Sequence, residues 1–293
     1  MFMRQRPAAP CIYGVACMTN SWIAGLIAVF VWWFSTGILL WRVRFADNAG
    51  GDAHFRSVMF GLPLLFAGVA GLHLSLTDTS TSGVYYGFLS ALAIWGWIEL
   101  AFLSGVITGP ERRTCPPDAP FATRLTRAIG TIAYHEALLI GTLLLIAYAS
   151  GGMPNHFAAL TFAVLFFARI SAKLNLFLGV PRINVEFLPK PLAHLPSHFR
   201  NSRMNGFFPF AVTGLTFAAG CWLERALSAP TDASQIGYVL LAALTLLALL
   251  EHWFMVLPLP DQKLWRWMMP AQKTKPAKAT PLLDSLKENS HGL

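Results

Sequence analysis

Apolar runs of about twenty residues recur along the chain and are separated by shorter polar stretches. A transmembrane helix needs about 20 mainly apolar residues, because each residue adds 1.5 Å along the axis and the hydrocarbon core is about 30 Å thick. The runs that reach this length are 22–41, 57–76, 84–107, 128–149, 157–178, 207–225 and 236–257. The pattern therefore predicts an all-α, multi-pass membrane protein with a bundle of seven transmembrane helices.

The same pattern divides the chain into three regions. Residues 1–21 form an N-terminal segment, residues 22–257 form the membrane domain, and residues 258–293 form a basic tail rich in Pro and Lys. Such a composition cannot bury a core, so we expect the tail to be largely disordered. Met18 lies directly before the first apolar run, which suggests that residues 1–17 are a start-site extension outside the translated protein.

Composition supports the membrane class and removes others. Of the 293 residues, 55% are hydrophobic and only 12% are charged, whereas soluble domains carry about 25% charged residues. The net charge of +8 comes from Lys and Arg that lie mostly between the apolar runs, so we expect membrane lipid around the protein and no nucleic-acid partner. The four cysteines form no CxxC pair, which argues against a disulfide framework or a cysteine metal site.

Lys and Arg alternate between the loops in a way that predicts the orientation. The loops 42–56, 108–127 and 179–206 and the tail hold most of them, whereas the loops 77–83, 150–156 and 226–235 hold none. Under the positive-inside rule, this places the N-terminus outside and the C-terminus in the cytoplasm. Arg4 and Arg6 disagree with that orientation, and the start-site hypothesis would account for them.

Ionisable residues within the apolar runs gather at one depth. At 1.5 Å per residue, they lie about 8–14 Å below the predicted cytoplasmic edge, and charges at such depth are costly unless paired or functional. This polar layer consists of Glu99, His135, Glu136, Arg169, Lys173, Glu251 and His252. His73 lies in the outer half of its helix, away from the layer.

Two readings of the polar layer stay open. Arg169 and Lys173 are four residues apart and share one helix face, so they can form interhelical ion pairs with Glu99, Glu136 or Glu251. The other reading is a ligand or metal site. Its candidate metal ligands are Glu99, His135, Glu136, Glu251 and His252, although the Glu-x-x-His spacing of di-iron bundles is absent.

Histidine and tryptophan residues are also candidates for holding a pigment. A histidine can bind a chlorin or haem axially, and His73, His135 and His252 lie at membrane depth. Trp95 and Trp97 lie deep enough to line a pocket for a planar ligand. For each of these side chains, packing inside the bundle is the alternative explanation.

The longest loop inside the membrane domain, 179–206, is unusually apolar. Gly179 and Pro181 are expected to stop the preceding helix. The apolar side chains that follow suggest contact with a partner protein or with lipid headgroups, and they are Phe187, Leu188, Leu192, Leu195 and Phe199.

Two stretches carry a resemblance to a known family. They are Ala172-Lys173-Leu174-Asn175-Leu176-Phe177-Leu178-Gly179-Val180-Pro181, continued by Asn184 and Glu186-Phe187-Leu188-Pro189, and Phe30-Val31-Trp32-Trp33-Phe34-Ser35-Thr36-Gly37. They resemble the PuhE-type photosynthetic complex assembly proteins of purple bacteria, whose genes accompany that of the reaction-centre H subunit. The resemblance covers about residues 20–257, and the family supplies no catalytic residues to carry over.

The resemblance implies a factor of the bacterial inner (cytoplasmic or intracytoplasmic) membrane. It would act in reaction-centre and light-harvesting assembly or in bacteriochlorophyll supply, through contacts with complex subunits or pigment-synthesis enzymes and without turnover of its own. It also implies a bacteriochlorophyll or related tetrapyrrole as the cofactor to look for. The alternatives are a membrane metalloenzyme that uses the Glu and His residues of the polar layer, and a proton-coupled transporter that uses Glu99, Glu136 and Arg169.

Overall fold

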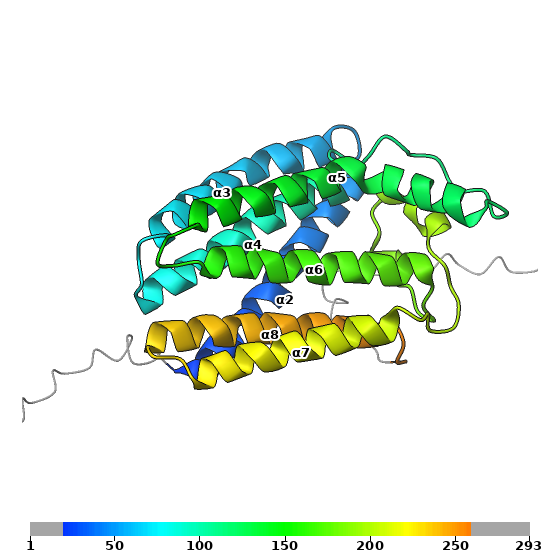
Figure 1. Ribbon diagram of the computed structural model, residues 1–293. Helices are drawn as coiled ribbons and strands as arrows, with labels where there is room; N and C mark the ends of the chain where they lie inside the picture. Colours follow the sequence, from blue (N-terminus) through cyan, green and yellow to red (C-terminus); the bar gives the residue numbers. More distant parts are fainter. Residues whose placement is uncertain (1–19, 259–293) are drawn as a thin grey trace, which may run out of the picture.

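The computed structural model describes residues 20–258, except for the side chain of Phe187. The predicted N-terminal segment and basic tail, including the start-site hypothesis, fall almost wholly outside this range. Within it, the protein is built from long helices joined by loops (Figure 1). The helices are α2 (Ser21–Ala49), α3 (Ala53–Ser75), α4 (Thr81–Leu103), α5 (Phe121–Ser150), α6 (Phe157–Leu178), α7 (Phe208–Leu227) and α8 (Asp232–Phe254).

Six of these helices are long and apolar enough to cross a membrane. They are all of the long helices except α7, which has 20 residues and packs along α8. This confirms a multi-pass membrane protein with an all-helical fold in the described range. The protein surface is accordingly apolar along the helices, and side chains such as Phe60, Phe66 and Phe217 are strongly exposed, as expected of surfaces that face lipid.

Local sequence explains where several helices begin and end. Asn20 accepts a hydrogen bond from the backbone of Trp22 at the start of α2, and Thr231 and Ser234 form a reciprocal capping box on α8. As predicted, α6 stops at Gly179, whose φ of 125° is open to glycine alone. The two largest differences from the predicted runs are that α2 continues to Ala49 and that α5 already begins at Phe121, because polar residues extend both helices beyond their apolar runs.

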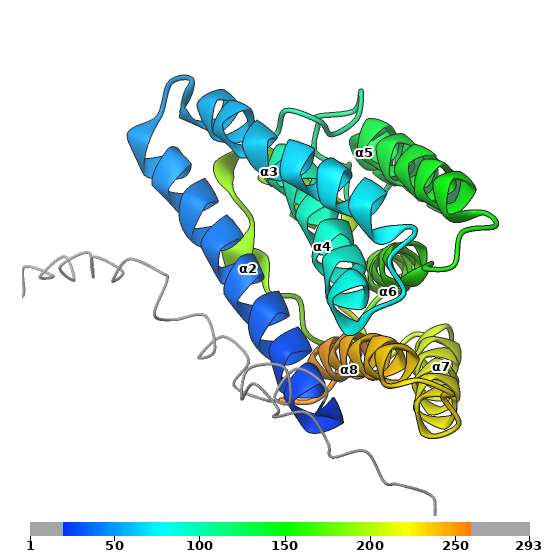
Figure 2. The same ribbon diagram turned by 90° about the vertical axis from the view of Figure 1, so that its left-hand side faces the viewer.

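Helix α4 lies in the middle of the bundle and is the most buried of the six apolar helices (Figures 1 and 2). One core cluster joins it to α2, α6 and α8 through residues such as Phe88 and Leu240, and a second joins it to α3, α5 and α6 through residues such as Ile94 and Phe162. The pair α3–α4 approaches closely because a Cβ atom on Gly68 would lie 2.9 Å from Ile94 Cγ1. This rigid centre positions the polar residues described below.

Three short 3₁₀ turns shape the loop between α6 and α7: Val185–Phe187, Lys190–Leu192 and Leu195–His198. The loop lies over the ends of α2, α4 and α8. We call that end of the bundle the basic end, because the loop carries Arg182, Lys190, Arg200 and Arg203. At α2, the backbone and side chain of Lys190 both bond to Asp47, with Nζ 2.7 Å from the Asp47 carbonyl oxygen. At α8, the backbone N–H of Arg182 bonds to the carbonyl oxygen of Met255 at 3.1 Å. The loop is therefore fixed across the basic end.

Candidate functional site

Two interhelical ion pairs occupy the predicted polar layer. Arg169 on α6 donates through Nη2 to Glu99 Oε2 on α4 at 2.9 Å, and Lys173, one turn further along α6, pairs with Glu136 on α5. Glu99 is almost fully buried, with 7% of its surface exposed. The structure thus ties α6 to both of its neighbours by charge, and each pair joins groups that would be costly to hold singly at membrane depth.

His135 lies beside the first pair but is sealed in the core. It has no exposed surface, its ring stacks on Phe102 with the centroids 4.3 Å apart, and its Nε2 lies 3.7 Å from Glu99 Oε1. Neither ring nitrogen has a hydrogen-bond partner within the described residues. A metal ion or pigment would reach this histidine only if Phe102 or Glu99 moved.

His252 has both ring nitrogens in use. Nδ1 lies 2.7 Å from the Ala248 carbonyl oxygen, and Nε2 lies 2.9 Å from Ser171 Oγ. Because a carbonyl oxygen only accepts, Nδ1 carries a proton, and in the neutral imidazole Nε2 then accepts from the Ser171 hydroxyl. His252 thus links α8 to α6, and a ligand at either ring nitrogen would have to displace one of these contacts.

The remaining pigment candidates lie apart. His73 is exposed near the end of α3, far from the polar layer. Trp97 donates its Nε1–H to the Val58 carbonyl oxygen at 3.2 Å and so joins α4 to α3, whereas Trp95 lines a cavity described below. The five side chains predicted as pigment ligands do not form one site, and pigment binding by any of them stays a prediction.

The candidate metal ligands are also divided among separate contacts. Glu99 faces Arg169, Glu136 faces Lys173, and His252 faces Ser171. Across residues 20–258, no three His, Cys, Asp or Glu side chains come close enough together to hold a metal ion. The metalloenzyme alternative therefore has no ligand cluster to build on in this part of the chain.

Glu251 differs from the other carboxylates of the layer. No hydrogen bond or ion pair joins it to another described residue, and Arg169, which lines the same two cavities, already pairs with Glu99. Glu251 also lines two cavities. It is thus the one carboxylate of the described polar layer that is open to a ligand.

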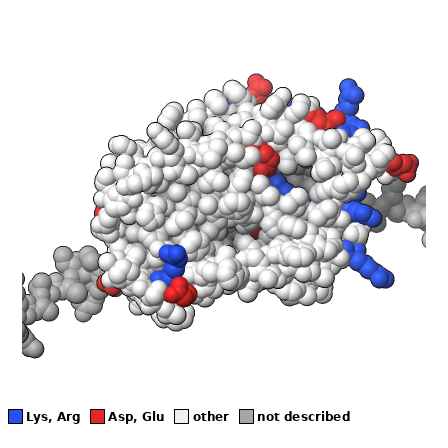
Figure 3. Space-filling view, in the orientation of Figure 1, with Lys and Arg blue, Asp and Glu red and all other residues white. Residues whose placement is uncertain are grey.

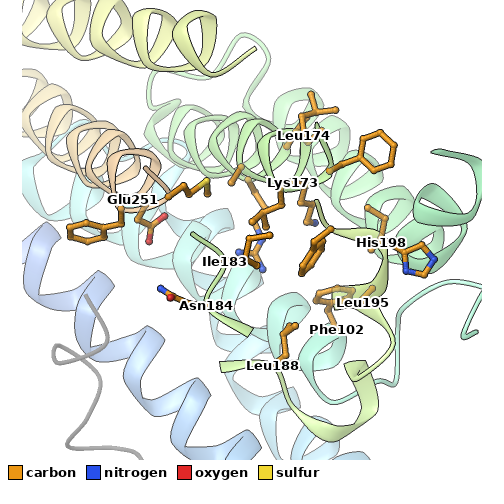
Figure 4. A pocket seen from close by; sticks show the side chains of 18 of the residues that line it. Phe102, Lys173, Leu174, Ile183, Asn184, Leu188, Leu195, His198 and Glu251 are labelled. Atoms are coloured by element: carbon orange, nitrogen blue, oxygen red, sulfur yellow. The ribbon is translucent and has the colours of Figure 1, made fainter. Parts of the chain in front are cut away.

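The larger cavity has a volume of about 710 Å³ and lies under the 182–199 segment (Figure 4). Its wall is mostly apolar and comes from α2, α4, α5, α6, α8 and the loop, with Glu136, Arg169, Lys173, Arg182 and Glu251 as its charged residues. Volume and lining match those of small-molecule sites, which are concave, mainly apolar and carry a few placed polar groups.

The smaller cavity, of about 310 Å³, lies between α2, α4, α6 and α8. Arg169, Glu251, Asn184 and Trp32 belong to the walls of both cavities. The two spaces therefore adjoin at the Arg169–Glu251 level. The sequence analysis named Trp32 and Asn184 in the two stretches that carry the family resemblance, but it did not predict that they line a cavity.

The apolar loop residues are largely explained by internal packing. Leu192 is fully buried and Leu195 nearly so, and both pack with Phe102, while Leu188 and Phe199 are partly buried around them. Leu192 and Leu195 have no surface to offer a partner. Of the five residues predicted to contact a partner, Leu188 and Phe199 keep some exposed surface. The side chain of the fifth, Phe187, lies outside the described structure.

The loop also contains a histidine pair whose burial should make it sensitive to pH. Burial lowers the pKa of His198 and that of His194 below their usual range, and the Nε2 atom of each is buried without a hydrogen-bond partner in the described residues. In the unfolded chain these rings bind protons at about pH 6.5, so below that pH the unfolded state holds more protons and folding weakens. We expect the loop to open more often at pH 5.5 than at pH 7.5.

Hydrogen exchange of residues 190–200, corrected for the intrinsic rate, measures this opening. His198→Gln should remove part of the pH dependence, whereas His156→Gln, in the loop between α5 and α6, should retain it. Equal protection of the wild-type loop at both pH values would contradict the expectation.

Comparison with known proteins finds one relative and one family model that each match most of the chain. The chain is 60% identical over 254 residues to the "Uncharacterized 30.4 kDa protein in puhA 5'region" of Rhodobacter capsulatus, a match that covers 87% of this chain and 93% of the relative. No solved structure matches the chain. A family model described as "Protein of unknown function (DUF3623)" matches residues 18–276, which include the whole described range and part of the tail. The chain therefore belongs to the DUF3623 family.

Proposed function

We propose that this protein is an inner-membrane factor for photosynthetic complex assembly or bacteriochlorophyll supply. The observation that carries the proposal is the 60% identical relative, whose printed name places it in the puhA 5' region. The resemblance to PuhE-type proteins in the 30–37 and 172–189 stretches agrees with that location. The factor acts through contacts with complex subunits or pigment-synthesis enzymes and has no turnover of its own.

The arrangement of the polar layer supports a scaffold more than a catalyst. Glu99, Glu136, Arg169 and Lys173 hold one another across three helices, and His252 is held by α6. Groups bound in this way orient a bundle but have little freedom to exchange protons with a substrate. The larger cavity offers room for a pigment or pigment precursor, which is the form that pigment contact would take.

Deleting the gene in its phototrophic host tests the proposal. We expect the near-infrared absorption bands of the reaction centre and light-harvesting complexes to fall at least about threefold per cell and to return when the gene is restored. Messenger levels of the complex subunits should stay unchanged, because the factor is proposed to act after translation. Normal complex levels in the deletion strain would refute an assembly or supply role.

Pigment contact has its own test, namely the absorption spectrum of protein purified mildly from a bacteriochlorophyll-producing host. A stoichiometric chlorin band that is lost in His135→Ala or His252→Ala would assign the pigment to those residues. A band that survives both changes would mean that the pigment is bound by His73 or at a site without histidine. A colourless protein would limit the proposal to protein contacts.

We further propose that α7 also crosses the membrane, with the N-terminus outside and the C-terminus in the cytoplasm. Its 20 residues span about 30 Å, the thickness of the hydrocarbon core. Figure 3 shows most of the Lys and Arg side chains of the visible face at the basic end, with a largely uncharged belt along the helices. This distribution is typical of a cytoplasmic end.

Cysteine labelling on a cysteine-free background tests this topology. In intact spheroplasts, a membrane-impermeant maleimide should label Ser228→Cys, between α7 and α8, and should label Asp118→Cys only after permeabilisation. Labelling of both sites from the same side would show that α7 does not cross.

A further inference from the structure

Glu251 and the two cavities that it lines indicate a ligand-binding site, which is a property separate from the proposed role in photosynthetic complex assembly. We propose that the two adjoining cavities form one binding site for a lipid-soluble organic cation, with Glu251 as the counter-charge and aromatic side chains around the bound cation. The proposal concerns ligand binding by the purified protein, and it holds or fails independently of the role in photosynthetic assembly.

The pairing of charges around the cavities indicates which sign of charge a ligand should carry. Arg169 is paired with Glu99, and Lys173 is paired with Glu136. Each of these two cations therefore has its own carboxylate, and Glu251 has no cation paired with it among the described residues. Glu99 Oε1 and Glu136 Oε2 are buried without a hydrogen-bond partner among the described residues, which adds negative potential to the same region. Because Arg169 and Lys173 balance Glu99 and Glu136, an anion would meet the unbalanced charge of Glu251 at membrane depth, whereas a cation would complete a third pair.

Arg182 is the other cation of the larger cavity, and it faces elsewhere. Its Nη1 donates to the Leu257 carbonyl oxygen at 2.5 Å, six residues beyond Glu251 on the chain. Arg182 therefore fixes the loop to the end of α8 and leaves the Glu251 carboxylate for a ligand.

Aromatic side chains surround the same space. Trp32 lines both cavities, Trp33 and Phe254 line the larger one, and Trp95 lines the smaller one. The face of an aromatic ring attracts organic cations, and this attraction is strongest where water is excluded. A carboxylate together with several aromatic rings is the combination that recognises ammonium and phosphonium groups, whereas apolar walls accept the rest of a lipid-soluble molecule.

The position of the site favours entry from the bilayer. The 182–199 segment covers the larger cavity and is fixed at both sides, by Arg182 to the end of α8 and by Lys190 to Asp47 of α2. Leu174, Leu247 and Leu250 of α6 and α8 line the larger cavity, and Figure 3 shows a hollow on the face between α6 and the α7–α8 pair. A ligand already dissolved in the membrane can therefore reach Glu251 without crossing the loop between α6 and α7.

Two probes of nearly equal shape and opposite charge test the inference. Tetraphenylphosphonium and tetraphenylborate are titrated into the full-length protein in non-ionic detergent, and heat or tryptophan fluorescence is recorded after subtraction of empty micelles. We expect one saturable site for tetraphenylphosphonium, at least about tenfold tighter than any saturable site for tetraphenylborate, which corresponds to about 1.4 kcal/mol. Equal or tighter saturable binding of tetraphenylborate would overturn the proposal.

Two variants locate the site. Glu251→Gln should weaken tetraphenylphosphonium binding at least about tenfold, whereas Glu224→Gln, an exposed carboxylate on α7, should bind like the wild type. Ala172 lines both cavities, so Ala172→Phe should fill their junction and also abolish binding without changing any charge. If either Glu251→Gln or Ala172→Phe, folded as judged by elution and melting temperature, binds tetraphenylphosphonium as well as the wild type, the assignment to this site is wrong.

Discussion

Replacing Arg169 with leucine is expected to remove most of the folded protein from the membrane. Glu99 is 7% exposed, lies in the central helix α4 and has Arg169 as its hydrogen-bonding partner at 2.9 Å. Without the guanidinium, this carboxylate must either lose its charge or remain ionised in a medium of low dielectric constant. Breaking a fully buried ion pair from one side costs about 3–5 kcal/mol, and because the Arg169 side chain is 40% exposed we expect the cost here at the lower end of that range, still a large part of the stability of most proteins.

The double variant Glu99→Leu with Arg169→Leu separates loss of the pair from loss of its charges. Replacing both members of a buried ion pair by apolar residues is often neutral or stabilising, so we expect the double variant to recover most of the lost stability. Arg56→Leu, at an exposed position of α3, is the control and should change stability by less than about 0.5 kcal/mol. Melting temperature in detergent and abundance in washed membranes are the measurements.

A single Arg169→Leu variant as stable and abundant as the wild type would contradict this account. It would show that Glu99 is satisfied by other means, of which His135 at 3.7 Å is the nearest. Loss of stability in both the single and the double variants would show instead that the Arg169 side chain packs rather than pairs. Full recovery in the double variant would show that the pair orients the bundle without being needed for folding.

The depth of the polar residues could be predicted from the sequence, but their partners could not. Counting residues from the ends of apolar runs places Glu99 and Arg169 at a similar level, and one helix turn separates Arg169 from Lys173. Which carboxylate meets which cation depends on the rotation of each helix about its axis. That rotation follows from packing around α4, through contacts such as those of Ile94 and Phe162, and no local pattern encodes it.

The loop between α6 and α7 shows a second limit. Leu192 and Leu195 looked like a surface for a partner because a loop next to a membrane is expected to be polar. They are buried because Phe102, at the end of α4, provides an apolar surface on which the loop folds. The apolar character was visible in the sequence, but the surface that covers it belongs to a residue about 90 positions away.

The existence of the helices was the most secure prediction, since hydrophobic runs of this length have few other solutions. The exception is α7. Its 20 residues form a helix, as predicted, but it is not among the six helices that are long and apolar enough to be identified as membrane spans. The cavities were not predicted at all. They arise because side chains from α2, α4, α5, α6 and α8 converge under one loop, and Trp32 and Asn184 became visible as lining residues only through that convergence.

Substituting Gly109 with alanine is expected to destabilise the protein by about 2–4 kcal/mol. The segment before α5 lies directly on the backbone of that helix: the His135 N–H bonds to the Thr108 carbonyl oxygen at 2.9 Å, and the Glu111 N–H bonds to the Gly130 carbonyl oxygen at 3.1 Å. Figure 1 shows α5 bent along its length, and a segment inserted into the hydrogen-bond ladder is a known cause of such bends.

Gly109 allows that insertion because it has no side chain. A Cβ atom there would lie 2.0 Å from the Gly130 carbonyl oxygen and 2.8 Å from the Thr131 carbonyl carbon. Both are backbone atoms, so no rotamer change relieves the clash, and the segment must withdraw from α5. Withdrawal breaks the two hydrogen bonds and frees the helix around His135, whose ring contacts Phe102 and Glu99.

Gly141, further along the same helix, is the matched control. A Cβ atom at Gly141 would meet nothing within 4 Å, and alanine is the better helix former by about 0.5–1 kcal/mol, so Gly141→Ala should raise the melting temperature while Gly109→Ala lowers it. If both substitutions shift the melting temperature in the same direction, the insertion at Thr108 and Glu111 does not hold α5 in its bent form. If only Gly109→Ala loses stability, the contact of the 108–111 segment with the backbone of α5 stabilises the protein.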